Sequence, residues 1–375
     1  MTSLFDIPVS ELLRRFGTIA PAVSAERSLR AAYALEASPW QSRKLREAAA
    51  EFTLTVPPVA ARTEAADGTT KFLLTLADAR AVECVLIPSV RGTWSREQMS
   101  ARNRDDGAAR RRRPTSAACV STQVGCGAGC SFCASGLGGL TRNLTAGEIV
   151  AQALLLRQEA AAHGLRLATV VFMGMGEPLH NVENVITAIH NLTHRHAGAL
   201  PPSGITVSTV GILTGMKALA ESHAPPHLAV SLHAPDDETR AKIVRAAPRL
   251  WSVEETLDAA VAYSAATKRY VTISYVLLDG INDAPAQAEL LARRIGGRKL
   301  HVNLIPHNAV DGLPFRAATP DNAHRFWTIL REHGAIVHIR KARGAGEDAA
   351  CGQLRRRAEA PALPNHAASF DRRRS

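Results

Sequence analysis

Three cysteines within eight residues constrain this chain more than any other feature. They are Cys126, Cys130 and Cys133, spaced CxxxCxxC on a glycine-rich loop. Thiolates are soft ligands that select zinc, copper or iron–sulfur centres. A structural zinc site normally closes with four ligands, and no second CxxC pair occurs in the chain. The spacing therefore favours an iron–sulfur cluster with one open iron over a zinc loop or free thiols.

The same spacing resembles that of the radical S-adenosylmethionine (SAM) superfamily. The resemblance implies that the three cysteines hold a [4Fe–4S] cluster. It also implies that the open iron binds the amino and carboxylate groups of SAM. An electron from the cluster would then split the sulfonium and give a 5′-deoxyadenosyl radical.

The bulk properties indicate a globular enzyme with an affinity for polyanions. The 375 residues are enough for a barrel-sized domain and a small companion, and 46% of them are apolar. The net charge of +11 favours nucleic acid or an anionic membrane surface, although an inert basic surface explains it too. No apolar run is long enough to span a membrane, and no secretory signal is evident. Because no span is evident, we expect no membrane partner. Because the cysteines cluster like ligands and not like a disulfide framework, and no signal is evident, we expect a cytoplasmic location.

The order of motifs predicts four regions. Residues 1–68 form a small helical accessory domain, with Val9, Leu12 and Phe16 at helical spacing. The many arginines of this segment suit RNA docking and a solvated helical face equally well. Residues 69–116 hold a hairpin and an arginine-rich insert, residues 117–345 the core, and residues 346–375 a loop with a basic tail.

A β-hairpin is expected from strands at 71–76 and 82–88, and one acidic residue interrupts the second strand. That residue is Glu83, in otherwise apolar surroundings. Its side chain either faces water on an edge strand or has a catalytic role, and the residues alone favour the edge position. The insert that follows carries Arg110 to Arg113 and reads as a mobile loop. The insert could contact phosphates or be a tolerated surface insertion.

From residue 117 onward, short apolar strands alternate with amphipathic helices. This alternation predicts an α/β fold with a parallel sheet, arranged as a partial (β/α)6-type barrel. The expected strands lie near 117–123, 167–173, 205–210, 227–232, 269–278 and 299–305, with a seventh near 335–340. The expected helices lie near 145–163, 182–195, 214–222, 253–266, 283–294 and 319–333. Thr145 and Glu148 form a capping box at the start of the first helix.

Polar and glycine residues gather where these strands end. In a parallel barrel the carboxyl ends of the strands share one rim, and that rim carries the chemistry. The three-cysteine loop follows the first strand, and Gly176 with Glu177 follows the second. The later strands end near Ser208, Ser231 and Asn308. We therefore expect one site at this rim.

At this level of detail, residues 82–354 resemble the RlmN/Cfr family of radical SAM RNA-adenosine methyltransferases. The stretches that carry the resemblance are Val82-Glu-Cys-Val-Leu-Ile-Pro88, Cys119-Val-Ser-Thr-Gln-Val-Gly-Cys126, Gly174-Met-Gly-Glu-Pro178, Val207-Ser-Thr-Val-Gly211, Ser231-Leu-His-Ala-Pro235, Val276-Leu-Leu-Asp-Gly-Ile-Asn-Asp283, Asn303-Leu-Ile-Pro306 and Ala350-Cys-Gly-Gln-Leu354. The insert before Cys119 and the basic tail depart from the family pattern. Neither departure touches the residues of the expected chemistry.

The resemblance implies three catalytic residues. Cys351 would carry a methyl group taken from one SAM, because a thiolate is a good nucleophile. A second SAM, cleaved at the cluster, would give the radical that activates this methyl for addition to an electrophilic adenine carbon. Glu83 matches the group that accepts the proton from that carbon. Cys119 matches the cysteine that releases the product by forming a transient disulfide with Cys351.

The resemblance also implies a SAM-binding set. Gly176 and Glu177 would contact the methionine amino group, since a carboxylate binds an ammonium strongly. The further SAM contacts would be Ser208, Ser231, Leu232, His233 and Asn308. The glycine could instead serve a plain turn, and each of the others could be an ordinary polar group of the rim.

The expected activity is methylation of an adenine ring carbon, C2 rather than C8, in 23S ribosomal RNA, with transfer RNA as a further substrate. The electron donor would be a protein such as flavodoxin or ferredoxin. Two other functions stay open from the residues. One is a radical SAM enzyme acting on a peptide or small molecule. The other is a metal-stabilised RNA-binding protein without activity.

Overall fold

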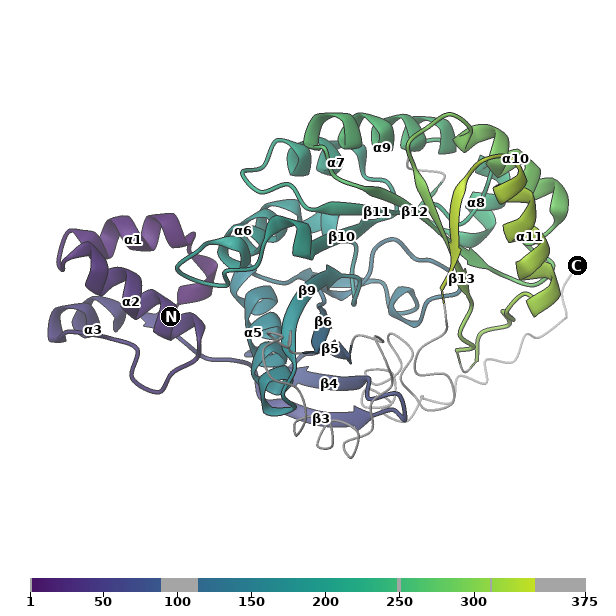
Figure 1. The fold of residues 1–375 in the computed structure, drawn as a ribbon. Helices are drawn as coiled ribbons and strands as arrows, with labels where there is room; N and C mark the ends of the chain where they lie inside the picture. Colours follow the sequence, from purple (N-terminus) through teal and green to yellow (C-terminus); the bar gives the residue numbers. More distant parts are fainter. Residues whose placement is uncertain (1, 89–113, 248–250, 311, 341–375) are drawn as a thin grey trace, which may run out of the picture.

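A ten-stranded sheet organises the protein. The computed structural model describes residues 2–88, 114–247, 251–310 and 312–340. The strand order is β14-β13-β12-β11-β10-β9-β6-β5-β4-β3, and the sheet curves around a central space (Figure 1). Helices cover its outer face (Figure 1). The α/β partial barrel expected from the sequence is therefore confirmed.

Seven neighbouring strands of this sheet are parallel, as expected for strands that are joined by helices. They are short, and β6, β10, β11 and β12 are mostly buried, as expected for strands of a covered parallel sheet. Strands β9 and β13 are only partly buried, and β14 is largely exposed. Each one matches a strand expected from the alternating pattern, including the seventh. Their bounds are β6 Thr115–Cys119, β9 Arg166–Phe172, β10 Ile205–Thr209, β11 His227–Ser231, β12 Val271–Leu277, β13 His301–Pro306 and β14 Ile336–Ile339.

Helices connect the parallel strands and lie close to their expected positions. They are α5 Ala146–Ala162, α6 Val182–Thr193, α7 Leu213–Ala220, α9 Val253–Thr267, α10 Pro285–Ile295 and α11 Pro320–Glu332. The capping box of Thr145 and Glu148 is present at the start of α5. A further helix, α8 Asp237–Ile243, escaped the sequence analysis because it is only seven residues long. It begins with a side-chain cap from Asp236.

The expected hairpin is confirmed, and it extends the main sheet. Strands β4 Thr70–Thr75 and β5 Ala81–Pro88 are antiparallel, and β5 also pairs with β6. A third strand, β3 Val59–Glu64, pairs with β4, so the expectation that residues 1–68 are helical is wrong at this point. Since β5 lies between two partners, the preference for an edge position of Glu83 is wrong as well. Its side chain is 3% exposed.

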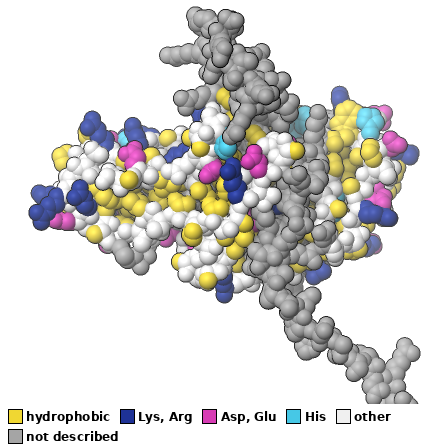
Figure 2. All heavy atoms as spheres, turned by 90° about the horizontal axis from the view of Figure 1, so that it is seen from below, with side chains coloured by type: hydrophobic (Ala, Val, Ile, Leu, Met, Phe, Trp, Pro, Cys, Tyr) yellow, Lys and Arg dark blue, Asp and Glu magenta, His cyan; other side chains and the backbone are white. Residues whose placement is uncertain are grey.

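The N-terminal segment contains η1 Leu4–Asp6, α1 Val9–Gly17, α2 Ala22–Tyr33 and α3 Arg43–Ala49, with a small pair of strands, β1 Thr2–Ser3 and β2 Phe52–Thr53. It packs against the outer helices α5 and α6. The side chain of Asn191 on α6 accepts from Val9 N–H at 2.9 Å and donates to the carbonyls of Phe5 and Ile7 at 3.0 Å. Figure 2 shows dark-blue Lys and Arg side chains at the left end, over these helices.

Within the described residues, no helix is both long and apolar enough to cross a membrane. The arginine-rich insert and the C-terminal loop with its basic tail lie almost entirely outside the described residues.

Candidate active site

One cavity of about 340 Å³ lies at the carboxyl ends of the parallel strands. The structure brings most of the sequence-predicted site residues to it. Those that line it are Cys119, Cys126, Cys130, Cys133, Gly176, Glu177, Ser208, Ser231, His233 and Asn308. The convergence on one rim that the strand pattern predicted is therefore observed as a shared cavity.

The cysteine loop connects the two strands of a small hairpin, β7 Gln123–Gly125 and β8 Leu140–Asn143. Gly125 has φ +80°, and a Cβ there would lie 2.0 Å from the carbonyl oxygen of Gly139. Only glycine permits this close approach at that backbone angle. The far side of the loop is held by residues after α8, where Cys130 forms a β-bridge with Val244. The loop is thus held at its base by the hairpin and along its length by the bridge between Cys130 and Val244.

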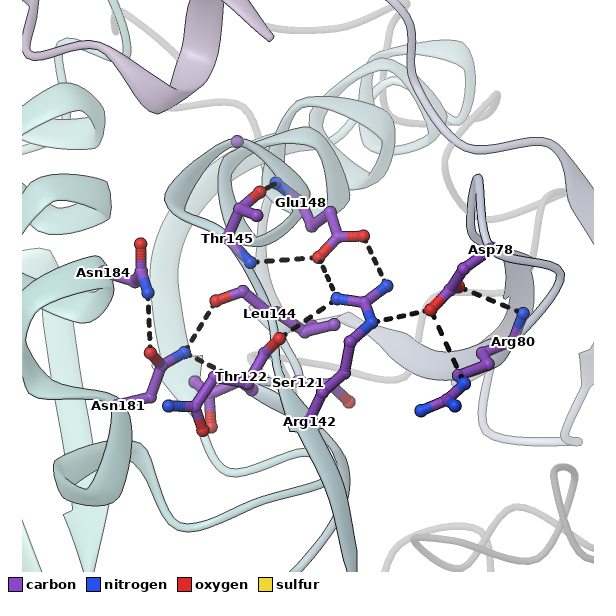
Figure 3. Close-up of polar contacts among 12 residues, drawn as sticks. Asp78, Arg80, Ser121, Thr122, Arg142, Leu144, Thr145, Glu148, Asn181 and Asn184 are labelled. Atoms are coloured by element: carbon purple, nitrogen blue, oxygen red, sulfur yellow. Dashed lines mark hydrogen bonds and ion pairs between the residues drawn. The ribbon is translucent and has the colours of Figure 1, made fainter. Parts of the chain in front are cut away.

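Arg142 of β8 ties this hairpin to the rest of the fold (Figure 3). Its guanidinium donates to both carboxylate oxygens of Glu148 at 2.8 Å and to Asp78 Oδ2 at 2.7 Å. Glu148 belongs to α5, and Asp78 to the turn between β4 and β5. Asn181, shown beside them, donates to the carbonyls of Thr122 and Leu144 at 2.9 and 2.8 Å.

Burial and mutual repulsion oppose the thiolate forms of the loop cysteines. Burial, with the nearby charges of Cys133 and Glu177, raises the pKa of the Cys126 thiol to about 11. The pKa of Cys130 is raised well above its usual value, mainly by burial. Thiolates crowded in this way require a cationic centre, which stabilises the deprotonated form. The donor set therefore fits an iron–sulfur cluster.

Among the residues that the structure describes, no three His, Cys, Asp or Glu side chains are grouped closely enough to hold a metal ion. The three thiols instead share the wall of the cavity.

Glu177 joins two of the strand ends. One carboxylate oxygen accepts from Leu179 N–H at 3.0 Å, and the other accepts from Val210 N–H at 2.8 Å. Burial raises its pKa to about 7, although these two N–H groups and Thr209 lower it. Each oxygen retains a second lone pair, so the carboxylate can also accept from a bound ammonium group.

Gln123 was missed by the sequence analysis, although it lies three residues before Cys126. Its Oε1 accepts from Glu177 N–H at 2.8 Å, and its Nε2 donates to Asn143 Oδ1 at 2.8 Å. The side chain is fully buried. Gly176 has φ +106°, and a Cβ there would lie 2.6 Å from the Cβ of Gln123. Gln123 therefore links the cysteine hairpin to the turn that carries Glu177. The one signal of its role in the sequence was a polar residue within an expected strand.

Another part of the cavity wall combines hydroxyls and rings. Ser208 Oγ and Ser231 Oγ lie 3.2 Å apart on neighbouring strands. His233 accepts from Val276 N–H at Nδ1, and burial lowers its pKa to about 3, so it is neutral at physiological pH. The ring of Phe132, within the cysteine loop, packs edge-on against His233 with centroids 5.1 Å apart.

Leu232 does not line the cavity. It is fully buried in the core, and its N–H donates to Ser274 O.

Arg240 is a second residue that the sequence analysis missed. It is 1% exposed, donates to Trp251 O at 2.9 Å and donates to Val210 O. Its charge opposes the rise in the Cys130 pKa. Because Val210 N–H binds Glu177, Arg240 supports the same strand end from behind. Nothing in its surrounding sequence indicated this position.

The hairpin strands form the remaining wall. Cys119 pairs in register with Val85, and both line the cavity with Ile87. Glu83 lies two residues before Val85, so it shares that face of β5, although it does not itself line the cavity. Cys84 points into the core, as expected, and is 1% exposed. Cys351 lies outside the described residues.

The fold and the thiol-lined cavity define a radical SAM enzyme, and residues 120–290 match the radical SAM superfamily. A probable dual-specificity RNA methyltransferase RlmN 1 from Opitutus terrae is 44% identical over 321 residues, covering 84% of each chain. A probable RlmN from Symbiobacterium thermophilum is 44% identical over 301 residues, covering 78% of this chain and 72% of that protein.

A solved structure agrees with these relatives. The crystal structure of a radical SAM methyltransferase from Sphaerobacter thermophilus has a TM-score of 0.82 and 35% identity, and covers 94% of this chain and 99% of that one. The chain belongs to the RlmN family of radical SAM methyltransferases. It is therefore a SAM-dependent enzyme, and the interpretation as a binding protein without activity is wrong.

Proposed function

We propose that this enzyme methylates a ring carbon of adenine, C2 rather than C8, in 23S ribosomal RNA, and that transfer RNA is a second substrate. The observation that carries the proposal is the cavity that gathers the three thiols, Glu177 and Cys119 in a chain 44% identical to a named RNA methyltransferase. A peptide or small-molecule substrate would not explain the net charge of +11.

Two groups of residues would bind the cluster and SAM. Cys126, Cys130 and Cys133 would hold the [4Fe–4S] cluster, which would supply the electron for the reductive cleavage of SAM. Glu177 accepts from the SAM amino group, since its oxygens have free lone pairs and face the cavity. Ser208, Ser231, His233 and Asn308 position the rest of SAM, and Gly176 leaves room for its amino group.

The thiolate of Cys351 takes the methyl group from a first SAM and becomes S-methylcysteine, releasing S-adenosylhomocysteine. Hydrogen abstraction gives 5′-deoxyadenosine and a methylene radical on the sulfur of Cys351, and this carbon adds to the adenine carbon. Glu83 removes the proton from that adenine carbon. Cys119 attacks the sulfur of Cys351, so that the S–CH2 bond breaks, the released carbon takes up the thiol proton of Cys119 to become a methyl group, and a disulfide is left. The one electron that remains would return to the cluster.

Two features support this arrangement. Arg340, just after β14, lines the cavity, and Cys351 follows it by eleven residues. An extended chain of that length spans at most about 40 Å, so Cys351 is within reach of the cavity. Cys119 lines the wall of the same cavity, where Cys351 would meet it.

The exposed arginines of the N-terminal helices support RNA docking. Arg14, Arg27 and Arg46 are exposed. No ion pair involves them in the part of the chain that the structure describes. Since its RNA substrates and reduced flavodoxin or ferredoxin are found together in the cytoplasm, we place the enzyme there.

The test is mass spectrometry of 23S ribosomal RNA and transfer RNA from cells with and without the gene, with digestion to nucleosides. We expect a methyladenosine that disappears with the gene and that neither C351A nor C119A restores. Purified C351A should still cleave SAM reductively. An unchanged nucleoside profile, or full product formation by C351A, would refute the proposal.

A further inference from the structure

One arginine lines the cavity and has no side-chain partner among the described residues. Arg340 lines the cavity and is exposed to solvent. Its backbone N–H donates to Leu304 O at 2.8 Å, which extends the pairing of β14 with β13. Its guanidinium has no hydrogen-bond or ion-pair partner within the described ranges. Among the described residues, the backbone of Arg340 therefore has a partner while its guanidinium has none.

Two other arginines near the site, neither of which lines the cavity, are engaged. Arg142 is paired with Asp78 and Glu148, and Arg240 is buried against backbone carbonyls. The acidic side chain among the described lining residues is that of Glu177, whose oxygens accept from two backbone N–H groups. Within the described residues, Arg340 and Glu177 form no ion pair, so this lining does not neutralise the charge of Arg340.

The walls near the mouth are apolar and come from both ends of the sheet. Val85 and Ile87 come from the hairpin, and Ile305 and Pro306 come from the end of β13. Apolar surfaces of this kind suit the faces of a nucleobase. An enzyme that modifies a base must take it out of its stack, and the sugar–phosphate backbone then stays at the entrance.

We propose that Arg340 binds a phosphate of the RNA backbone next to the target nucleotide while the base occupies the cavity. The proposal rests on the proposed RNA substrate and names one residue that holds it. A guanidinium matches a phosphate with two parallel N–H donors, whereas a lysine offers only a point charge. The contact carries no base information, so it should strengthen binding of any sequence placed there.

The first test compares full-length R340A and R340K with R325A in binding and methylation of an RNA fragment. Arg325 is an exposed arginine on α11 that does not line the cavity, so R325A is the matched control. R340A should raise KM for RNA about tenfold, and R340K should recover part of the loss. The slope of log Kd against log salt concentration should fall by about 0.7 for one lost phosphate contact. SAM affinity, measured by calorimetry, should stay within twofold.

The second test removes the charge from the RNA instead. A methylphosphonate placed at each linkage beside the target adenosine should weaken wild-type binding at one position, and R340A should be insensitive to that position. Equal RNA affinity and salt slope in R340A and wild type would overturn the proposal. So would additive losses from R340A and the neutral linkage. If the wild-type enzyme fails to bind RNA, the proposed function itself is overturned. This outcome is read from the wild-type measurement without reference to the Arg340 variants, so the two failures are distinguishable.

Discussion

Replacing Gln123 with methionine separates positioning of the SAM site from general stability. Methionine nearly preserves the shape of the side chain but removes both hydrogen bonds. Asn143 is exposed and can bind water, whereas Glu177 N–H is buried and loses its acceptor. An orphaned buried donor costs roughly 1–3 kcal/mol, so Q123M should lower the free energy of unfolding by about that amount.

The functional effect should exceed what stability explains. Without its anchor, the backbone at Glu177 must be ordered when SAM binds, at about 1–2 kcal/mol per residue. The Kd for SAM should therefore rise about tenfold, since 1.4 kcal/mol corresponds to a factor of ten. Calorimetry on the reconstituted enzyme measures the Kd, and urea denaturation measures the stability. Iron and sulfide content should match the wild type.

A second glutamine supplies the control. Gln287 also makes two hydrogen bonds, to Ile281 O at 2.9 Å and from Ala284 N–H at 3.0 Å, but far along the chain at the start of α10. Q287M should lose stability without a change in SAM affinity. If Q123M binds SAM as tightly as Q287M does, Gln123 does not position Glu177 and the reasoning fails.

Three further predictions follow from the same site. G176A should destabilise the protein by at least about 1 kcal/mol in urea denaturation, because φ is +106° and the added Cβ would meet Gln123; an unchanged midpoint would contradict this. SAM affinity should rise with pH through about 7 as Glu177 ionises, and E177Q should abolish that dependence in calorimetry at pH 6–8. For folding the sign is opposite: because the carboxyl pKa is raised from 4.5 to about 7, the free energy of unfolding falls as pH rises over that interval. E177Q should flatten the dependence of the free energy of unfolding on pH. If E177Q keeps that dependence, another group causes it. R142M should lose iron on gel filtration faster than the wild type while its unfolding midpoint changes by less than that of G176A, since Arg142 is partly exposed; equal iron retention would show that the hairpin holds without it.

The sequence predicted the sheet because its signals were local. The parallel strands β6 and β9 to β14 are short apolar runs between helices, and each could be located without knowledge of its partners, whereas the small hairpin of β7 and β8 was not predicted. The same holds for the cysteine loop and the capping box of Thr145, whose residues are close in sequence. The seven-residue α8 and the polar strand β3 lacked such a pattern. Strand β3 has exposed or partly exposed residues throughout, so its sequence has no buried face to reveal it.

The supporting residues could not be predicted, because their partners are remote in sequence. Gln123 binds a residue 54 positions away, and Arg240 donates to a carbonyl 30 positions away. Glu83 illustrates the same limit, since whether its strand is an edge depends on pairing between β5 and β6. For Cys351, Glu83 and the SAM-binding residues, the roles came from the family resemblance, and they stay predictions until tested.

The two outer strands of the curved sheet, β14 and β3, are not joined to each other in the order observed for the described residues. Residues near both ends of the sheet nevertheless reach the same cavity, Thr69 beside β4 and Arg340 after β14. A site at the rim of the strands lies on the surface of the sheet's carboxyl end, so it can take a unit from the middle of a polymer while the chain continues on either side. This geometry suits an enzyme whose target nucleotide is covalently linked to neighbours in both directions.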